Sequence, residues 1–276
     1  DERKSEISTD YSEINIEDLI KREDVVVSMT HYGYIKRVPV AEYKAQKRGG
    51  KGMVAHKPKE EDFVENMFIT NTHNDILFFT SKGRVYSLKG YEIPEGQKQA
   101  KGRAIVNLLE LAEEEKVTAI IPLINDMEGN LIQATRKGIV KKTSLEEYKK
   151  IRRVGKIAIN LDEGDELVAV QITTGRDEIL LATKQGKCIK FSEQEVRTLS
   201  RDTRGVRSIA LEKGDHVVDM IAIKPNHNIL TITENGYGKL CDPEEYRLQV
   251  RGGKGVKAGV FNEKTGLLVN MKQVKD

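Results

Sequence analysis

The chain has 276 residues, a formal net charge of +3 and no tryptophan, and 32% of its residues are charged. This length can bury a core of Ile, Leu and Val, and no apolar run approaches the ~18 residues of a membrane-spanning helix. Cys188 and Cys241 form no CxxC motif, which favours a reducing cytoplasm and argues against both a disulfide framework and a zinc site.

Along the chain, five short apolar runs each end in the motif T-x-x-G. The threonine and glycine of each motif are Thr30 and Gly33, Thr80 and Gly83, Thr135 and Gly138, Thr183 and Gly186, and Thr233 and Gly236. A second glycine follows each motif, and an acidic and then apolar run follows that glycine. The second glycines are Gly52, Gly102, Gly155, Gly205 and Gly255. Three landmarks recurring in a fixed order indicate a repeat architecture.

Each unit is predicted to contain four strands. The apolar runs are rich in β-branched residues and bounded by turn residues, and T-x-x-G is typical of a hairpin because glycine accepts a positive φ. Helical signal is limited to single turns after Ser144 and Asp242. Units of about 50 residues suit propeller blades, whereas the repeats of a linear β-solenoid, the weaker alternative, are usually shorter. We therefore predict one all-β, propeller-like domain over residues 1–276, with units at approximately 24–72, 73–127, 128–175, 176–226 and 227–276.

Positive charge is concentrated once per unit, between the two glycines, while the remainder of the chain is net negative. In a ring of equivalent units these basic stretches are expected to form a continuous belt, which suits the regular line of phosphates on duplex DNA. A protein-interaction scaffold remains an alternative, because single charge runs usually only solvate a loop. The acidic residues are expected to form a separate zone, which includes Glu60, Glu61, Asp62, Glu113, Glu114, Glu115, Asp162, Glu163, Asp165 and Glu166.

The predicted DNA contacts are the cations of the basic stretches together with the segment QKRGGKG. In the first two units they are Lys36, Arg37, Gln46, Lys47, Arg48, Gly49, Gly50, Lys51, Gly52, Lys82, Arg84, Lys98, Lys101 and Arg103. In the other three they are Arg136, Lys137, Lys141, Lys142, Arg152, Arg153, Lys184, Lys187, Lys190, Arg201, Arg204, Arg207, Arg251 and Lys254. No recognition helix or zinc finger is predicted, so we expect binding through phosphate contact and bending without base reading.

No pattern in the sequence indicates covalent chemistry. The five histidines occupy unrelated positions of the repeat, without a cysteine or carboxylate at metal-ligand spacing. The segment KRGGKGMV lacks the spacing and the Ser or Thr of a phosphate-binding loop, and no G-x-S-x-G occurs. We expect no catalytic residue, metal or cofactor in this chain.

The heptapeptide QKRGGKG, residues 46–52, resembles the signature Q-[K/R]-R-G-G-K-G of the C-terminal domain of the gyrase A protein, with all seven positions matching. The phrases THYGYIKRVPVAEY, YEIPEGQKQAKGRAIVNLL and RDTRGVRSIAL are also similar to that DNA gyrase family, so the resemblance covers essentially the whole chain. It implies a β-pinwheel, a propeller-like disc whose blades exchange strands. In such a disc the heptapeptide joins the first blade to the last and touches DNA at the end of the wrap.

The resemblance also implies a function: DNA is wrapped around the basic rim with a positive-handed crossing and presented for strand passage, which introduces negative supercoils. The implied partners are duplex DNA, the gyrase A N-terminal breakage-reunion domain and the gyrase B protein, in a heterotetramer that carries ATP and Mg²⁺ elsewhere. The isolated domain is expected to be a monomer in the bacterial cytoplasm. The related topoisomerase IV domain, which selects DNA crossings, is the alternative, but its heptapeptide is degraded or absent.

The family's disc usually has six blades, whereas five complete units are visible in this sequence. The chain stops at MKQVKD, where the first strand of a sixth unit is expected, and residues 3–8, RKSEIS, are a candidate strand for the last blade. A sixth unit beyond residues 1–276 and an open or five-bladed disc both remain open.

Overall fold

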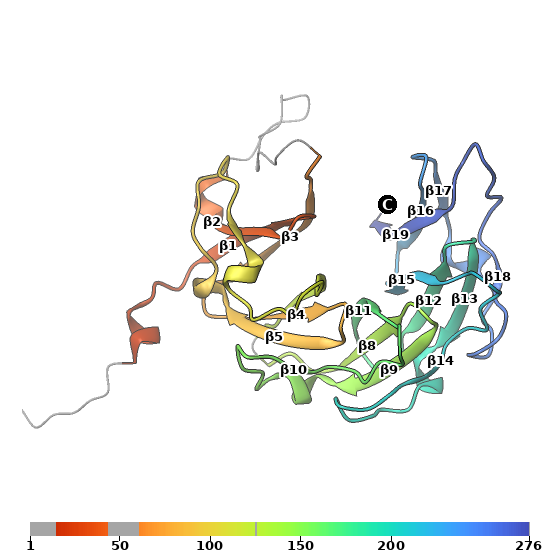
Figure 1. The fold of residues 1–276 in the computed structure, drawn as a ribbon, viewed down its shortest axis with the longest axis horizontal. Coiled ribbons are helices and arrows are strands. Elements are labelled where there is room, and N and C mark those ends of the chain that lie inside the picture. The colour runs from red at the N-terminus through yellow and green to blue at the C-terminus, as the bar shows by residue number, and fades with distance from the viewer. Residues whose placement is uncertain (1–14, 44–60, 125, 276) are drawn as a thin grey trace, which may run out of the picture.

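The computed structural model describes residues 15–43, 61–124 and 126–275, which form antiparallel β-sheets and short 3-10 helices (Figure 1). Five sheets, called blades 1 to 5, follow one another along the chain. The prediction of an all-β fold built from five repeats is therefore confirmed. No helix in the part that the structure describes is long and apolar enough to cross a membrane.

Within each blade the strands follow one another in hydrogen-bonded order from the inner strand outward. Blade 1 contains β3 (Val64–Asn71), β1 (Asp24–Thr30), β2 (Tyr34–Pro39) and β6 (Arg103–Ala104). Blade 2 contains β7 (Val117–Pro122), β4 (Asp75–Thr80), β5 (Arg84–Lys89) and β10 (Lys156–Ile157). Blade 3 contains β11 (Leu167–Thr173), β8 (Asn130–Thr135), β9 (Ile139–Ser144) and β14 (Val206–Arg207). Blade 4 contains β15 (Val217–Ala222), β12 (Glu178–Thr183), β13 (Lys187–Ser192) and β18 (Val256–Lys257), and blade 5 contains β19 (Leu268–Lys275), β16 (His227–Thr233) and β17 (Gly238–Cys241).

The helices of the described residues are single 3-10 turns, most of which follow an outer hairpin strand. Ser144 and Asp242 each cap such a turn by accepting a hydrogen bond from the backbone N–H two residues later, which confirms both predicted helical turns. The seven turns are η1 (Ile16–Leu19), η2 (Val40–Glu42), η3 (Gly90–Glu92), η4 (Ile105–Asn107), η5 (Leu145–Tyr148), η6 (Glu193–Glu195) and η7 (Pro243–Glu245).

Neighbouring blades exchange a strand, as the family resemblance implies. The short strands β6, β10, β14 and β18 each belong to one repeat but pair with the outer hairpin strand of the preceding blade. The second glycine of the repeat explains how the exchanged segment lies flush against that strand. A Cβ on Gly205 would lie 2.2 Å from the Val140 oxygen, and one on Gly102 would lie 2.5 Å from the Ile35 oxygen. Only glycine permits this approach of two backbones.

The T-x-x-G motif closes the central hairpin of each unit, as predicted. In blade 1 the Gly33 N–H donates to the Thr30 carbonyl at 2.9 Å, and the Thr30 hydroxyl accepts from the Tyr34 N–H at 3.2 Å. The same pair of bonds recurs around Thr135, where the Ile139 N–H reaches the hydroxyl at 3.1 Å. The threonine is therefore required by the turn, which gains a side-chain acceptor for an N–H that the ladder leaves unpaired.

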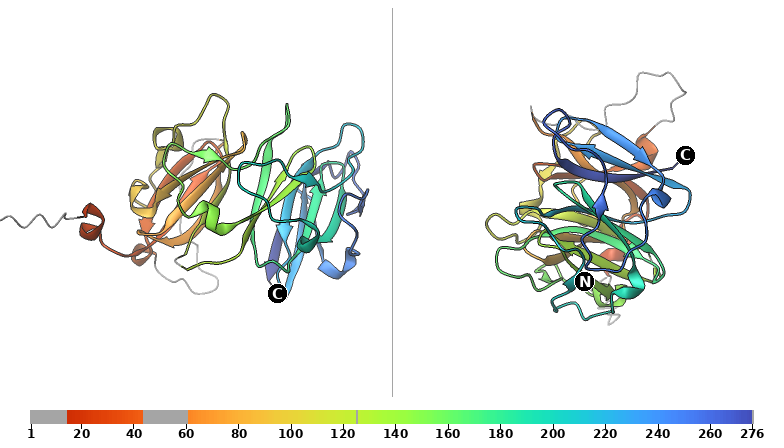
Figure 2. Two further views of the ribbon diagram at one scale, coloured as in Figure 1. Left: turned by 90° about the horizontal axis from the view of Figure 1, so that it is seen from below. Right: turned by 90° about the vertical axis from the view of Figure 1, so that its right-hand side faces the viewer.

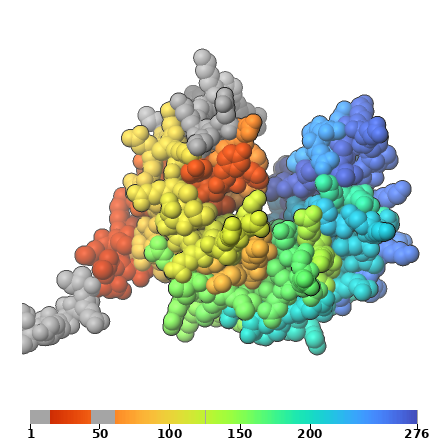
Figure 3. All heavy atoms as spheres, viewed as in Figure 1, coloured from red at the N-terminus to blue at the C-terminus, as the bar shows by residue number. Residues whose placement is uncertain are grey.

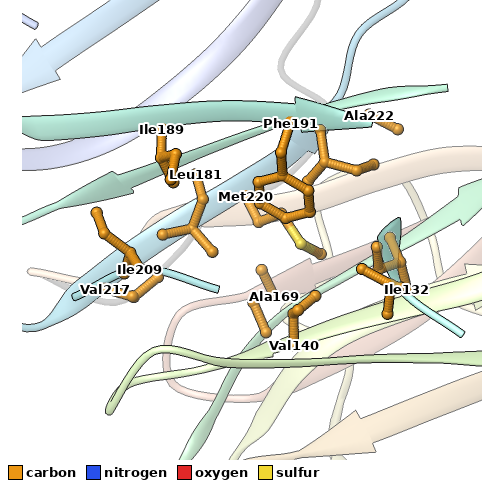
Figure 4. Packing of buried hydrophobic residues seen from close by; sticks show 13 residues of the cluster. Ile132, Val140, Ala169, Leu181, Ile189, Phe191, Ile209, Val217, Met220 and Ala222 are labelled. Atoms are coloured by element: carbon orange, nitrogen blue, oxygen red, sulfur yellow. The ribbon is translucent and has the colours of Figure 1, made fainter. Parts of the chain in front are cut away.

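The hydrophobic core is divided among the interfaces between blades. Blades 1 and 2, 2 and 3, 3 and 4, and 4 and 5 each share one cluster of buried aliphatic and aromatic side chains. Figure 4 shows the cluster between blades 3 and 4, where Val140 and Ala169 face Leu181, Phe191 and Met220. Because alternate residues of a strand point to opposite faces, the central hairpins of blades 2, 3 and 4 each supply side chains to two such clusters.

Blades 1 and 5 are the two ends of an open arc in the described residues. In Figure 1, β3 of blade 1 and β19 of blade 5 lie on either side of the open part, and the space-filling view shows a notch between them at its upper edge (Figure 3). Figure 2 shows the same succession of blades from two further sides. Among the described strands none pairs with the outer side of β17, so blade 5 has three strands where a fourth was predicted. Residues 3–8 and 46–52 lie outside the described residues.

Candidate nucleic-acid interface

Four outer loops lead from a 3-10 turn to the exchanged strand of each unit. We define them as residues 93–102, 149–155, 196–205 and 246–255. The first part of three of these loops runs parallel to the outer hairpin strand of the preceding blade, with Glu95 opposite Arg37 and Thr198 opposite Lys142. The chain then turns back and pairs antiparallel with the same strand as the exchanged strand. Because both ends of the loop rest on one strand, its middle projects from the outer edge of the blade.

Three of the outer loops contact the unit before them through arginine. The guanidinium of Arg153 donates to the Leu108 carbonyl at 3.0 Å, that of Arg201 to the Ile157 carbonyl, and that of Arg251 to the Arg207 carbonyl. In each case the acceptor lies in the unit before, in the segment that follows its outer loop: just after η4 for Arg153, on β10 for Arg201 and on β14 for Arg251. The repeat therefore joins the outer loops into one line along the rim.

Ten of the predicted DNA contacts lie on or beside this line. Arg103, Arg152, Arg153, Arg204, Arg207 and Lys254 are exposed, and Lys98, Lys101, Arg201 and Arg251 are half-buried. Lys101 is held over the Tyr34 ring, with its Nζ 3.5 Å from the ring centroid, so this tyrosine supports a cation beside the exchanged strand.

The other predicted cations lie near the hairpins. Lys82, Arg136 and Lys137 are exposed at the hairpin turns, whereas Arg37, Arg84, Lys184 and Lys187 are half-buried. Arg37 is committed to the neighbouring outer loop, because its guanidinium donates to the Ile93 carbonyl at 2.8 Å and to the Glu95 carboxylate at 2.9 Å. The segment Gln46, Lys47, Arg48, Gly49, Gly50, Lys51 and Gly52 lies outside the described residues.

Four of the lysines predicted to contact DNA are buried, and their ammonium groups are bonded within the protein, which argues against contact with DNA. Lys36 and Lys141 have no exposed surface, and Lys142 and Lys190 have 7% and 3%. Lys142 donates to the Glu193 carbonyl at 2.9 Å, and Lys190 to the Pro243 carbonyl at 3.1 Å. A phosphate would have to displace these carbonyls to reach the charge, so these side chains stabilise the fold instead.

Lys36 and Lys141 are bonded to the outer loops themselves. The Lys36 ammonium donates to the carbonyls of Gln97 at 3.0 Å and Ala100 at 2.9 Å, and also to that of Lys98. The Lys141 ammonium donates to the Ala158 carbonyl at 2.6 Å and the Ser200 carbonyl at 3.3 Å, and also to the Arg201 carbonyl. Burial lowers the pKa of both lysines, that of Lys141 to about 8.

The predicted separation of acidic and basic zones is wrong. The Asp165 carboxylate accepts the Lys137 N–H at 2.8 Å, so the acidic run that follows the second glycine caps the hairpin turn of its own unit. The Asp162 carboxylate accepts two bonds from Arg204, at 2.6 and 2.7 Å, and hydrogen bonding by this guanidinium lowers the pKa of Asp162. Lys187 pairs with Glu212 at 3.2 Å. Carboxylates and cations therefore interleave at the hairpin end of blades 3 and 4.

The exposed cations of the outer loops are less neutralised than those of the hairpins. Among the described residues, Arg103, Arg152, Arg207 and Lys254 form no ion pair within 4.0 Å. Their charge is thus available to an external anion. The basic belt predicted from the sequence is consequently narrower than expected, and it follows the outer loops in preference to the hairpin turns.

Two exposed cations of the exchanged strands were missed by the sequence reasoning, Lys156 and Lys257. They occupy β10 and β18, and Arg103 and Arg207 occupy the corresponding strands β6 and β14. The signal was present, since the second to fifth units each carry a cation one or two positions after their second glycine. The exposed Lys149 and Lys150 precede the second outer loop's arginines and were likewise not included.

Two features of the described residues concern metal and small-molecule binding. The described residues contain no group of three His, Cys, Asp or Glu side chains that could hold a metal ion. A surface pocket of about 480 Å³ is lined by Lys137, Asp162, Arg204 and Arg207 together with aliphatic side chains, so it belongs to the same basic rim.

Comparison of the sequence with known proteins identifies relatives along the whole chain. The chain is 47% identical over 277 residues to the DNA gyrase A protein of Escherichia coli (strain K12), covering all of this chain and 32% of that protein. It is 50% identical over 277 residues to the DNA gyrase A protein of Clostridium acetobutylicum, covering all of this chain and 33% of that protein. The chain therefore spans about a third of the length of these relatives.

Solved structures share the fold. The C-terminal domain of DNA topoisomerase IV superposes with a TM-score of 0.77 at 28% identity, over 93% of this chain and 79% of that chain. The DNA gyrase A C-terminal domain superposes with a TM-score of 0.72 at 27% identity, over 92% of this chain and 83% of that chain. Five segments, residues 24–71, 74–123, 130–174, 177–224 and 227–275, match the family described as "DNA gyrase C-terminal domain, beta-propeller". The chain belongs to the DNA gyrase C-terminal domain family, as the heptapeptide and the repeats indicated.

Proposed function

We propose that this domain binds duplex DNA along its outer loops, bends it around the rim and wraps it with a positive-handed crossing. The supporting observation is the line of outer loops, in which Arg153, Arg201 and Arg251 tie three of the four loops to the unit before them. A cationic track on a rigid, curved edge matches the spacing of a continuous phosphate backbone better than isolated patches do.

The proposed binding does not depend on base sequence. The described helices are 3-10 turns of three or four residues, which are too short to lie along a major groove as a recognition helix does. The exposed side chains of the track are lysines and arginines, which suit phosphate oxygens. Sequence preference is therefore expected to come only from the cost of bending.

Within a complete gyrase, the wrapped segment would be presented for strand passage, so that negative supercoils are introduced. The proposed partners are the gyrase A N-terminal breakage-reunion domain and gyrase B in a heterotetramer, in the bacterial cytoplasm. ATP and Mg²⁺ belong to other parts of that assembly in this proposal, and the isolated domain acts as a monomer.

Ligation of nicked circular DNA in the presence of the domain tests wrapping directly. The ligated circles are deproteinised and their linking number is compared with that of circles closed without protein. Trapped positive writhe supports the proposal, and its size should grow with the protein to DNA ratio. Unchanged linking number at saturating protein would refute wrapping.

The topoisomerase IV type of activity is a second candidate, favoured by the TM-score of 0.77 against 0.72 for the gyrase domain. A domain of that type would bind DNA crossings without wrapping a single duplex. The same ligation experiment separates the two, because tight binding to DNA without trapped writhe would favour this second candidate.

A further inference from the structure

In blades 1 to 4, one position of the repeat lies beneath the outer loop that comes from the next unit. It is the third residue after the T-x-x-G glycine, and it is occupied by Lys36, Tyr86, Lys141, Ile189 and Lys239 in blades 1 to 5. A Cβ on Gly155 of the second outer loop would lie 2.6 Å from the Tyr86 ring. One on Gly253 of the last outer loop would lie 3.8 Å from Ile189 Cδ1.

In blades 1 and 3 the position carries a lysine whose ammonium group is enclosed by backbone carbonyls. Lys36 bonds to three carbonyls of residues 97–100, and Lys141 to two carbonyls of residues 200–201 and to Ala158. An ammonium has three donors and no acceptor, so three carbonyls satisfy it fully. Moving the loop would remove all three of these carbonyls from Lys36 and would leave Lys141 with Ala158 alone, which is unfavourable for a buried charge.

Both loops held in this way carry cations of the proposed DNA track and lead to an exposed arginine. The loop on Lys36 leads through Lys98 and Lys101 to Arg103 on β6. The loop on Lys141 contains Arg201 and Arg204 and leads to Arg207 on β14. The buried ammonium group therefore fixes the backbone from which these side chains extend.

The next position along the same strand provides a contrast. Lys142 is also buried, but it donates to the Glu193 carbonyl of η6 and lies 4.0 Å from the Glu193 carboxylate, so it holds the 3-10 turn and not the middle of the loop. Lys141 and Lys142 thus differ in the segment that they hold, although both are buried lysines of β9.

We propose that Lys36 and Lys141 are positioning residues for DNA binding. Each ammonium shapes an outer loop so that the cations of that loop lie on the common track, without touching DNA itself. The inference rests on the proposed function, because it assigns a role to buried residues in the binding of the same duplex by the outer loops.

The test compares Lys141→Met with Lys142→Met in the full chain. Both variants remove one buried charge, so a loss that depends only on net charge affects them equally. Dissociation constants for a linear duplex are measured at several salt concentrations. We expect Lys141→Met to weaken binding by about 3- to 10-fold at low salt and to flatten the log–log salt dependence by more than one unit, since two or three phosphate contacts are lost. Lys142→Met should keep the wild-type slope.

A second comparison asks whether Lys141 acts through the cations of its loop. When Arg201, Arg204 and Arg207 are all replaced by glutamine, adding Lys141→Met should cause no further loss of affinity. Hydrogen exchange of residues 197–205 should be faster in Lys141→Met than in Lys142→Met. An unchanged affinity and salt slope in folded Lys141→Met would overturn the proposal, and so would a further loss equal to that in the wild-type background.

The design also covers the case in which Lys141→Met does not fold. If Lys141→Met lacks a cooperative melting transition, Lys36→Met is tested in the same way, with Lys98, Lys101 and Arg103 as the cations of its loop. Loss of folding in both variants would overturn the proposal, because both lysines would then be needed for the core. Absence of DNA binding by the wild-type chain would instead refute the proposed function.

Discussion

The ammonium group of Lys141 is buried and donates to three backbone carbonyls, and its burial affects its protonation. Burial removes water from the charge and lowers its pKa to about 8, from an ordinary value of 10.5. At neutral pH the group is therefore still charged and can donate to all three carbonyls. Its charge is nevertheless less stable in the folded chain than in the unfolded one.

This difference in pKa predicts a pH dependence of stability. Between pH 8 and 10.5 the unfolded chain binds more protons at Lys141 than the folded chain does, so this group's contribution to the free energy of unfolding rises with pH in that window. The difference in free energy of unfolding between wild type and Lys141→Met should therefore increase from pH 8 to 10, by at most ~1.4 kcal/mol per pH unit. Urea titrations of both proteins across this range provide the measurement, and a flat or falling difference would contradict the lowered pKa of Lys141.

The residue scale also shows where sequence reasoning reached its limit. The burial of Lys36 and Lys141 had a readable signal, because the aligned positions hold Tyr86 and Ile189, which are apolar core residues. The prediction assigned both lysines to the DNA-binding surface because of their charge, and did not use the apolar residues at the aligned positions. The pairing of Arg204 with Asp162 had no such signal, since the two residues meet only through strand exchange.

At the scale of elements, the second glycine of the repeat is the part of the sequence that strand exchange requires. The recurrence of this glycine was visible in the sequence. The need for glycine at this position was not visible, because the backbone that it approaches belongs to another unit. The T-x-x-G hairpins were predictable, since a turn depends on neighbouring residues only. Strand exchange itself was expected from the family resemblance and not from the periodicity of the residues.

Replacing Gly205 by alanine should weaken the exchange between blades 3 and 4. The added methyl group would lie 2.2 Å from the Val140 carbonyl oxygen, so β14 would have to move away from β9. We expect a loss of about 1–3 kcal/mol in the free energy of unfolding, as for other overpacked sites. Thermal and urea denaturation measure this loss, and hydrogen exchange should be faster in residues 205–208.

Gly253→Ala is the matched control for that substitution. Gly253 lies in the last outer loop, and the atom nearest to its added methyl group would be the Val250 oxygen at 3.4 Å, an ordinary contact. The free energy of unfolding of the Gly253→Ala variant should differ from that of the wild type by less than about 0.5 kcal/mol. Equal losses in the two variants would show that the close approach of Gly205 to β9 does not limit the fold.

For the molecule as a whole, the net charge of +3 does not indicate which part of the surface can bind DNA. Carboxylates neutralise many cations at the hairpin ends of blades 3 and 4, whereas the outer loops keep several cations exposed. Sequence alone could show that charge alternates once per repeat. It could not show which cations share a rim, because that depends on the exchanged strands.

Electrostatic binding along this rim predicts a steep salt dependence. With about 6–10 phosphates engaged, affinity for a long duplex should fall roughly 10³- to 10⁵-fold between 50 and 200 mM salt. Fluorescence anisotropy with a labelled duplex at a series of salt concentrations measures the slope. A nearly constant affinity over this range would exclude phosphate contact as the main source of binding.

Affinity cleavage tests the outer-loop track most directly. A DNA-cleaving probe is attached through a cysteine substituted at Arg103, Arg152, Arg207 or Lys257, one position per variant, in a background with Cys188 and Cys241 replaced by alanine. Lys116 and Lys213, exposed in the acidic runs, are the control positions. The end-labelled duplex carries flexible steps placed so that bending cost favours one register. The account predicts that the four rim probes cleave it at four successive positions in chain order, while the controls cleave weakly. Cleavage from the controls equal to that from the rim, or rim cuts without this order, would contradict it.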